Sequence, residues 1–519
     1  MSFVTAQAVA GVLQRAIVLY EGHPAAIDQL QRYTDRLAEP LRVALVGMVK
    51  AGKSTLLNAM LGEEIAPTDA GECTRIVTWY RYGDTPRVTL HGLDGTSRAL
   101  RVMRRHGRLV FDLEGTPADD VERLVVEWPS QSLRELTLID TPGIASLSTE
   151  VSARSTGFLL REDGPSDADV VIYLLRHLHE ADLEFLERLR DRSGSMSEAV
   201  NALVVLARAD EVGAGRIDAL LSANAVADRY RRDDALRTVA SGVVPVAGLL
   251  AQSARSLTRA EFAALGRFAE LDRPEREDLL VSADRFVKKG ALLGDNEADR
   301  AALVARFGIF GIRLSAVLVR SGVSTPKALA DELIRHSGLQ ELLALVSGRF
   351  ESRAGYLKAD AALTALEVLL REQPVEGADE LAEAIDMVRA SSHERNELDA
   401  LAGMGVDGSA LATELTEEAA RLLGRDGVLA AARLGLPEVA SPEEITVAAV
   451  AAIARWRALS ASPLADHATN ELCATVVRSC EALVDGAGAG SGHALAHLTL
   501  APEPRRAGGQ EARDQRRAG

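Results

Sequence analysis

Eight residues, Gly47 to Ser54, have the types and spacing that bind a nucleoside triphosphate. They read Gly-Met-Val-Lys-Ala-Gly-Lys-Ser, which fits the phosphate-binding pattern G-x-x-x-x-G-K-[ST] at every fixed position. In such a loop, backbone N–H groups close around phosphate oxygens, and the following helix adds partial positive charge. We expect Lys53 to reach the β- and γ-phosphates. The residues predicted to contact the nucleotide here are Gly47, Ala51, Gly52, Lys53, Ser54 and Thr55.

A second motif, Asp140-Thr-Pro-Gly143, follows a short apolar run and could complete a metal site. A carboxylate at the end of a strand beside the phosphate loop can hold Mg²⁺ through water, and the Gly143 N–H can then sense the γ-phosphate. The hydroxyl of Ser54 is the predicted direct ligand of Mg²⁺. An isolated Asp-x-Pro-Gly also forms ordinary turns, so the motif indicates a metal site only because a complete phosphate-binding loop precedes it in the sequence.

A threonine that closes over the γ-phosphate is the third expected metal ligand. Thr74 lies just before the predicted strand 76–82 and is the best candidate, because its hydroxyl can ligate Mg²⁺ and its carbonyl can hold water. Thr68 and Thr78 are the alternatives, and Thr74 could also simply begin a strand. The predicted metal ligands are thus Ser54, Thr74 and Asp140.

Recognition of the base is expected from the sequence Arg208-Ala-Asp210 after an apolar run. Asp210 can accept hydrogen bonds from both the N1–H and the 2-amino group of guanine, a pair that adenine does not offer. The planar guanidinium of Arg208 can stack on the base, and Ala247 and Gly248 could donate backbone N–H groups to its oxygen. A helix cap is the alternative interpretation of Asp210.

The elements that would position these residues alternate between strands and helices. Apolar runs at 41–46, 136–139, 170–175, 202–207 and 243–246 are predicted strands, and helical periodicity lies between them. This alternation predicts a mostly parallel, doubly wound α/β sheet. Amphipathic helices before and after it predict a helical bundle. The predicted boundaries are N-terminal helices 1–39, the nucleotide domain 40–336, a helical stalk 337–485 and a disordered tail 486–519.

Composition limits the classes of partner. The net charge of −16 argues against a nucleic-acid binder, because neutralising phosphates needs a basic face. We expect no signal peptide, no membrane-spanning segment and no disulfide framework from the three cysteines, and therefore a cytosolic protein. The ten histidines show no ligand set for zinc.

Taken together, the phosphate loop, Thr74, Asp140-Thr-Pro-Gly and Ala207-Arg-Ala-Asp210, with helices on both sides, resemble the bacterial dynamin-like GTPases, in particular their isoniazid-inducible actinobacterial members. The resemblance runs to about residue 485. It implies a dynamin-like GTPase with GTP and Mg²⁺ as ligands. It also implies G domains that pair as a homodimer, or with a second dynamin-like chain, and a stalk that works on the inner face of the cell membrane. Peripheral contact with anionic lipids would follow.

The sequence departs from the broader dynamin pattern at three positions. Lys50 stands where dynamins have a polar residue that helps to hold a monovalent cation, so its ammonium could replace K⁺ or Na⁺ and stabilise the transition state. A solvated surface lysine is the alternative. Arg208 replaces the usual Lys of the base motif, and Ile144 follows Gly143 where a Gln would orient water. The predicted catalytic residues are Lys50, Lys53, Thr74 and Gly143.

Two classes of function therefore stay open from the sequence. One is a mechanoenzyme that hydrolyses GTP faster when G domains pair and that remodels or maintains the membrane. The other is a GTP-dependent switch or scaffold that recruits partners without remodelling membranes. A ribosome or RNA factor is disfavoured, because the chain is acidic and has no basic RNA-binding module.

Overall fold

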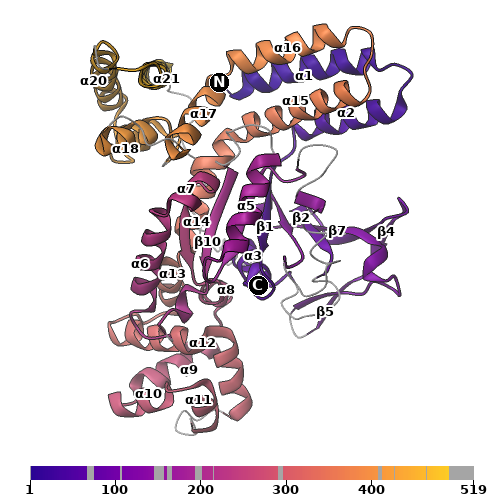
Figure 1. Cartoon of the computed structure of the whole chain (residues 1–519). Helices are drawn as coiled ribbons and strands as arrows, with labels where there is room; N and C mark the ends of the chain where they lie inside the picture. Colours follow the sequence, from indigo (N-terminus) through magenta and orange to yellow (C-terminus); the bar gives the residue numbers. More distant parts are fainter. Residues whose placement is uncertain are drawn as a thin grey trace, which may run out of the picture.

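A mixed nine-stranded sheet lies at the centre of the computed structural model (Figure 1). The structure describes residues 2–66, 75–105, 108–144, 157–159, 166–192, 201–213, 215–289, 296–406, 412–425, 427–462 and 465–489. The strand order is β11-β10-β9-β1-β8-β2-β7-β3-β4. Its strands are β1 (Leu41–Gly47), β2 (Val77–Tyr82), β3 (Arg87–Gly92), β4 (Ser97–Leu100), β7 (Val121–Trp128), β8 (Leu136–Asp140), β9 (Val170–Leu175), β10 (Ala202–Ala207) and β11 (Val243–Val246). A separate hairpin is formed by β5 (Val102–Arg105) and β6 (Arg108–Phe111).

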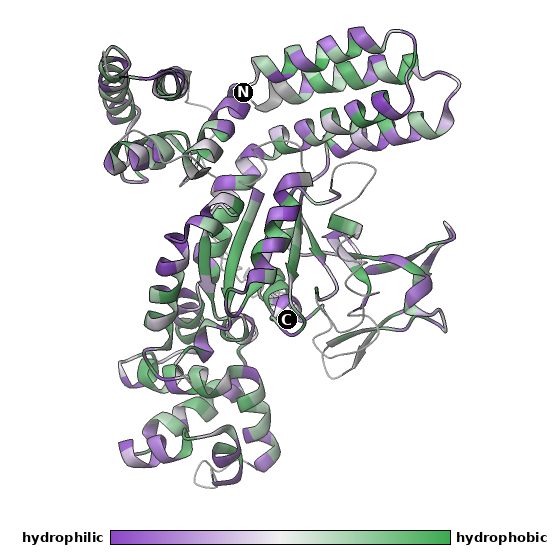
Figure 2. Ribbon diagram, in the orientation of Figure 1, coloured by the Kyte–Doolittle hydropathy of each residue, from purple (hydrophilic) through white to green (hydrophobic). Residues whose placement is uncertain are grey.

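The five strands from β11 to β8 are parallel, and both of their faces are covered. Every residue of β9 and β10 is buried. Strand β10 is coloured as hydrophobic along its length in Figure 2. Side chains of β1 alternate between two cores, with Val43 and Leu45 in one and Ala44 and Val46 in the other. Helices therefore pack on both faces, as the βα alternation of the sequence predicts.

The helices around the sheet fall into two sets. Those that pack on it are α3 (Lys53–Leu61), α5 (Glu180–Arg192), α6 (Ala219–Arg231), α7 (Asp234–Val239), α8 (Gly248–Arg255), α13 (Pro326–His336) and α14 (Leu339–Leu345). A helical extension at one end of the sheet, at the bottom of Figure 1, is formed by α9 (Arg259–Glu270), α10 (Arg273–Leu279), α11 (Ala283–Lys289) and α12 (Glu297–Arg320).

Helix α12 is long and apolar enough to cross a membrane by length and composition alone, which the sequence analysis did not anticipate. It is not one straight helix, because Gly308 has φ 62° and ψ 173° and divides it into two parts. Neither part reaches the about 20 residues that a bilayer requires. Phe307, Phe310 and Leu314 are buried against the neighbouring helices, so the apolar residues of α12 serve a protein core.

A four-helix bundle projects from the sheet (Figure 1). It joins the N-terminal helices α1 (Ser2–Leu19) and α2 (Pro24–Arg36) to α15 (Ala354–Glu372) and α16 (Ala378–Ser391). Leu13, Leu30 and Leu366 are fully buried between them. The apolar stripes predicted on the N-terminal helices thus find their partners more than 300 residues later in the chain, which confirms that the bundle uses both ends of the sequence.

The remaining helices form a second cluster of their own around Trp456, Cys473 and Cys480. They are α17 (His393–Val406), α18 (Thr413–Leu422), α19 (Ala430–Leu434), α20 (Pro442–Ser460) and α21 (His467–Ala489). The sequence suggested one bundle, whereas the described helices form two cores, one that joins α1 and α2 to α15 and α16 and one that joins α17 to α21. Of the predicted tail, residues 486–489 end α21 and the others lie outside the described residues.

A buried charge network joins this second cluster to the start of α15. Glu397 accepts hydrogen bonds from Ser479 at 2.7 Å and from Arg433, and it pairs with His393 at 3.3 Å and with Arg353 at 3.6 Å. Burial alone would raise the pKa of Glu397, but the hydrogen bond with His393 and the two guanidinium groups lower this pKa to about 2. The carboxylate is therefore ionised and stabilises the fold across the neutral pH range.

We predict that Glu397→Gln destabilises the protein by about 3 kcal/mol at neutral pH, because two buried guanidinium groups lose their counter-ion. The folded pKa of about 2 lies below the ordinary value of 4.5, so this stabilisation is complete above pH 4.5 and is lost as the pH falls toward 2. Urea unfolding near pH 7 and near pH 3.5 measures both effects. Exposed Glu471→Gln is the control, and an equal loss at both pH values would contradict the prediction.

Candidate functional site

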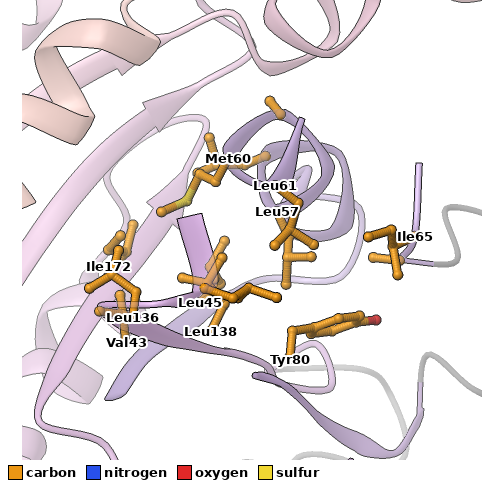
Figure 3. Close-up of a cluster of buried hydrophobic side chains, with 14 of the residues drawn as sticks. Val43, Leu45, Leu57, Met60, Leu61, Ile65, Tyr80, Leu136, Leu138 and Ile172 are labelled. Atoms are coloured by element: carbon orange, nitrogen blue, oxygen red, sulfur yellow. The ribbon is translucent and has the colours of Figure 1, made fainter. Parts of the chain in front are cut away.

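The phosphate loop lies between the end of β1 and the start of α3, as the sequence predicts. Gly47 has φ 149°, and a Cβ atom added there would lie 2.3 Å from the carbonyl oxygen of Leu174, so only glycine fits. The Lys53 ammonium is buried and donates to the carbonyl oxygens of Gly47 at 3.0 Å and Met48 at 3.3 Å. Helix α3 is held against the sheet by Leu57, Met60 and Leu61 (Figure 3).

A buried carboxylate faces the start of α3. The pairing of β1 with β8 sets Asp140 opposite Leu45, and its Oδ2 accepts a hydrogen bond of 2.9 Å from Ser54 Oγ. Within the described part of the chain, Asp140 Oδ1 is buried without a hydrogen-bond partner. Burial raises the pKa of Asp140 and lowers that of Lys53, while the attraction between the two groups opposes both shifts.

This arrangement fits Mg²⁺. A hydroxyl oxygen and a carboxylate with a spare buried oxygen are the hard ligands that this ion prefers, and added positive charge would offset the cost of burying Asp140. Ser54 and Asp140, two of the three residues predicted as metal ligands, are thus brought together. Thr74 lies outside the described residues, as does its alternative Thr68. Thr78 is buried inside β2, where its hydroxyl donates to the carbonyl of Ile76 at 3.3 Å.

The Asp-Thr-Pro-Gly motif leaves β8 in direct contact with the phosphate loop. The Thr141 hydroxyl donates to the carbonyl of Leu45 at 2.8 Å, and the Ile144 N–H donates to the carbonyl of Gly47 at 3.1 Å. A Cβ atom added to Gly143 would lie 2.5 Å from Val49 Cγ2 and 2.9 Å from its Cα. Gly143 is therefore required for the close approach of the two loops, and its N–H lies beside the phosphate loop.

A cavity of about 160 Å³ adjoins the phosphate loop on the side of β10 and β11. Six of the predicted nucleotide-contacting residues line this cavity, namely Ala51, Gly52, Thr55, Arg208, Asp210 and Gly248. Asp210 is only 7% exposed, and burial raises its pKa. The N–H of Ala247 donates to the carbonyl of Ser337 at 2.8 Å, so the structure does not give Ala247 the predicted role of a donor to the base.

Arg208 connects the base motif to the phosphate loop. Its backbone has φ 55°, and its guanidinium donates to Glu211 at 2.8 Å and to the carbonyl of Lys50 at 3.1 Å. Lys50 itself has φ 64°, a left-handed conformation that is costly for a side chain other than glycine, and its side chain is exposed. The arginine therefore holds the loop residue whose ammonium is proposed to act in catalysis.

Asn58 is an important residue that the sequence analysis missed. It is 1% exposed on α3, accepts from the N–H groups of Ile65 at 2.9 Å and Ala66 at 2.7 Å, and donates to the Ala66 carbonyl at 3.0 Å. These bonds fix the chain where it enters segment 67–74, which contains Thr74. The sequence feature that could have identified Asn58 is a polar residue among the apolar positions of a buried helix.

Comparisons with known proteins agree with this site. The Dynamin family profile matches residues 43–208, which contain the phosphate loop and Asp140. The isoniazid-induced protein IniC of Mycobacterium tuberculosis is 42% identical over 486 residues, which cover 92% of this chain and 98% of that protein. The chain belongs to the dynamin family. It is a bacterial dynamin-like protein close to IniC, and, like other dynamin-family members, it is a GTPase.

Two further relatives match over shorter stretches. The isoniazid-induced protein IniA of Mycobacterium tuberculosis is 32% identical over 145 residues, which cover 26% of this chain and 22% of that protein. The bacterial dynamin-like protein of Nostoc punctiforme is 32% identical over 115 residues, or 20% and 16% of the two chains.

Among solved structures, an oligomerised bacterial dynamin pair described as sensing and tethering membranes is 13% identical to this dynamin-like chain. The match covers 81% of this chain and 78% of that one, with a TM-score of 0.30. At that score, the similarity carries no argument about how the parts are arranged.

The position of Lys50 in this dynamin-like GTPase leads to a prediction about monovalent cations. If the Lys50 ammonium takes the place of a bound K⁺ or Na⁺, GTP turnover will be unchanged when K⁺ is replaced by a large organic cation. Lys50→Ser will lower turnover about 100-fold or more, the scale of one transition-state donor. Steady-state phosphate release measures both.

Lys50→Gly provides the control for the backbone of the loop, because glycine adopts φ 64° without strain. If Lys50→Gly loses activity, the loss is due to the missing ammonium and not to a strained backbone. Lys50→Arg, which keeps the positive charge, should retain part of the GTP turnover rate. Stimulation of the wild-type chain by K⁺ would contradict the role of the ammonium.

Proposed function

We propose that this dynamin-like GTPase hydrolyses GTP with Mg²⁺ in a site that is completed when two G domains pair. We further propose that its helical part couples turnover to remodelling or maintenance of the cytoplasmic membrane, with the protein located in the cytoplasm and bound peripherally at the inner face. The partner is a second copy or another dynamin-like chain. The observation that carries the catalytic part is the buried Asp140 carboxylate beside Ser54 and Lys53.

Guanine specificity is supported by the cavity next to the phosphate loop. The buried carboxylate of Asp210 can accept two hydrogen bonds from guanine, whereas adenine would leave it unpaired, which costs more in a buried cavity than in water. Arg208 and Gly248 line the same cavity, so the base, the sugar and the phosphates would lie along one continuous path from Asp210 to Lys53.

Catalysis requires positioning and charge more than covalent chemistry. Bound Mg²⁺ would neutralise charge that develops on the β- and γ-phosphate oxygens. Lys53 would bind the same oxygens, and the Gly143 N–H would orient the γ-phosphate. Ile144 offers an aliphatic side chain after Gly143, and its N–H is already bonded to the carbonyl of Gly47. Orientation of the attacking water would therefore fall to the loop backbone and to Thr74, with pairing of G domains completing the arrangement.

The path from the site to the bundle runs through a buried ion pair. Asp169, which precedes β9, accepts from Arg36 of α2 at 2.6 Å and from the N–H of Arg42 at 2.8 Å. Lys358 of α15 donates to the carbonyls of Leu37 at 2.9 Å and Glu39 at 2.6 Å. Helices α2 and α15 are thus both fixed beside the start of β1, the strand that leads to the phosphate loop, which supports coupling between nucleotide state and bundle position.

Sedimentation velocity and vesicle co-sedimentation test this proposal. With GDP and aluminium fluoride, which occupies the place of the transferred phosphoryl group, we expect dimers, whereas GDP alone should leave monomers. Anionic vesicles should then sediment the protein in the dimer-forming state. Lys53→Ala is the blank. Dimers without vesicle binding would favour the switch or scaffold function, and monomers in every state, including mixtures with a second dynamin-like chain, would contradict pairing.

A further inference from the structure

A second and larger cavity, of about 470 Å³, lies where the sheet, the start of the stalk and the C-terminal helices meet. We call it the joint cavity. Among the described residues, its walls come from three separate parts of the chain, namely residues 230–243 up to the start of β11, residues 341–353 after α13, and residues 401–404 with 416–425 from α17, α18 and the turn that follows α18. In Figure 1 these elements converge above α7 and α14. The volume is within the range of small-molecule sites.

The charge of the joint cavity is strongly one-sided. Of the residues that the structure describes, five arginines line it and Glu341 is the single carboxylate in the lining. Glu341 is already paired with Arg231 at 3.4 Å, and Arg231 is paired with Asp228 as well. Within the described part of the chain, the ion-pair partner of Arg237 is Asp234 at 3.8 Å, and the Asp234 side chain is 97% exposed. The cavity therefore has a clear excess of positive charge and would favour an anion with more than one negative charge.

Two of these arginines are buried on an irregular stretch of helix. Arg349 lies in a π-helical turn, Val346–Phe350, and Arg353 ends the 3₁₀ turn Glu351–Arg353 that follows. Such turns interrupt regular helical hydrogen bonding and occur often at functional sites. Arg349 donates to the carbonyl of Ser241 on the opposite wall, at 2.5 Å. The irregular segment thus contributes two arginine side chains to the joint cavity, and one of them bonds to the opposite wall.

Arg353 supplies the observation that points to a ligand. Its side chain is 4% exposed, and its Nη2 donates to the carbonyl of Leu423 at 2.7 Å and faces Glu397 at 3.6 Å. Among the described residues, its Nη1 is buried with no hydrogen-bond acceptor. Burial lowers the pKa of Arg353, and Glu397 offsets that shift only in part because Arg433 also lies near. A buried donor of this kind is costly unless an acceptor is supplied.

We propose that the joint cavity binds a phosphate monoester, whose phosphate group accepts hydrogen bonds from Arg237, Arg349 and Arg353. Leu345, Leu401 and Met404 line the same cavity and offer apolar contact to the carbon portion of the ligand. The ligand could be a soluble phosphomonoester or the headgroup of a phosphatidate-like lipid, because both present the same dianionic group. Since the walls belong to the sheet-bearing part and to the C-terminal helices, binding would fasten these two parts together.

Isothermal titration with two probes, glycerol 3-phosphate and dihexanoyl phosphatidate, tests the proposal. The full chain is used with Lys53→Ala, which removes phosphate binding at the nucleotide loop. We expect saturable binding that Arg237→Gln weakens about tenfold or more through loss of a charge-assisted hydrogen bond. Met404→Trp should also weaken binding, because it fills the cavity and leaves every charge in place. Arg335→Gln, which removes an exposed arginine outside the cavity, should have no effect.

The outcomes separate the two sources and can overturn the proposal. Equal affinity for both probes would indicate a soluble phosphomonoester, and binding of phosphatidate alone would indicate a lipid headgroup. Hydrogen exchange should slow in 234–239 and 393–406, the two helices that the ligand would join. Absence of binding for both probes, or binding that survives either Arg237→Gln or Met404→Trp, would overturn the proposal. The titration is done with Lys53→Ala and does not depend on GTP turnover. Absence of probe binding would therefore leave the proposed GTPase function unaffected.

Discussion

The structure depends on one costly interaction, the burial of the Asp140 carboxylate beside Ser54 and Lys53. Burial in a low-dielectric core raises the pKa of this carboxylate and lowers that of the lysine, and only the attraction between the two neighbouring groups opposes these shifts and limits the cost. Parallel pairing of β1 with β8 enforces that contact, because it sets Asp140 opposite Leu45 at the root of the phosphate loop. A buried carboxylate with a spare oxygen suits a divalent cation, which supports the proposed role of Asp140 in holding Mg²⁺.

The same strand that positions the phosphate loop also connects the site to the rest of the molecule. At the start of β1, Asp169 and Lys358 hold the linker from α2 through Arg36 and through the backbone of residues 37–42. At its end, Gly47 contacts both the Lys53 ammonium and the Ile144 N–H. These contacts support the proposal that a change at the phosphates reaches the bundle through β1. The joint cavity lies on a different route, between the sheet edge and the C-terminal helices.

Much of this could be predicted from the sequence, for identifiable reasons. The strands 170–175 and 202–207 are continuous apolar runs, and the structure has them at the predicted residues. The phosphate loop and Asp140 were recognisable because catalysis fixes both residue type and spacing, and the pairing of β1 with β8 brings them together. The association of α1 and α2 with α15 and α16 confirmed the expected use of both chain ends.

Other features depend on tertiary contacts that local patterns do not encode. Asn58 looks like an ordinary helical residue until its bonds to Ile65 and Ala66 are seen. The N–H of Ala247 is taken by Ser337, a partner 90 residues away. The division into two helical cores and the arginines of the joint cavity likewise arise from segments that are distant in sequence. Thr74 stays a prediction, because it lies outside the described residues.

GTP turnover as a function of protein concentration is the most direct test of a site that is completed across a G-domain pair. Lys53→Ala serves as the blank and ATP as the competing nucleotide. We predict that the specific GTPase activity rises with protein concentration and then saturates, and that there is little turnover of ATP. A site completed by pairing would be contradicted if the specific activity were the same at every protein concentration, both for the chain alone and with a second dynamin-like chain added. Failure to bind GTP would contradict the role given to Asp210 and Arg208.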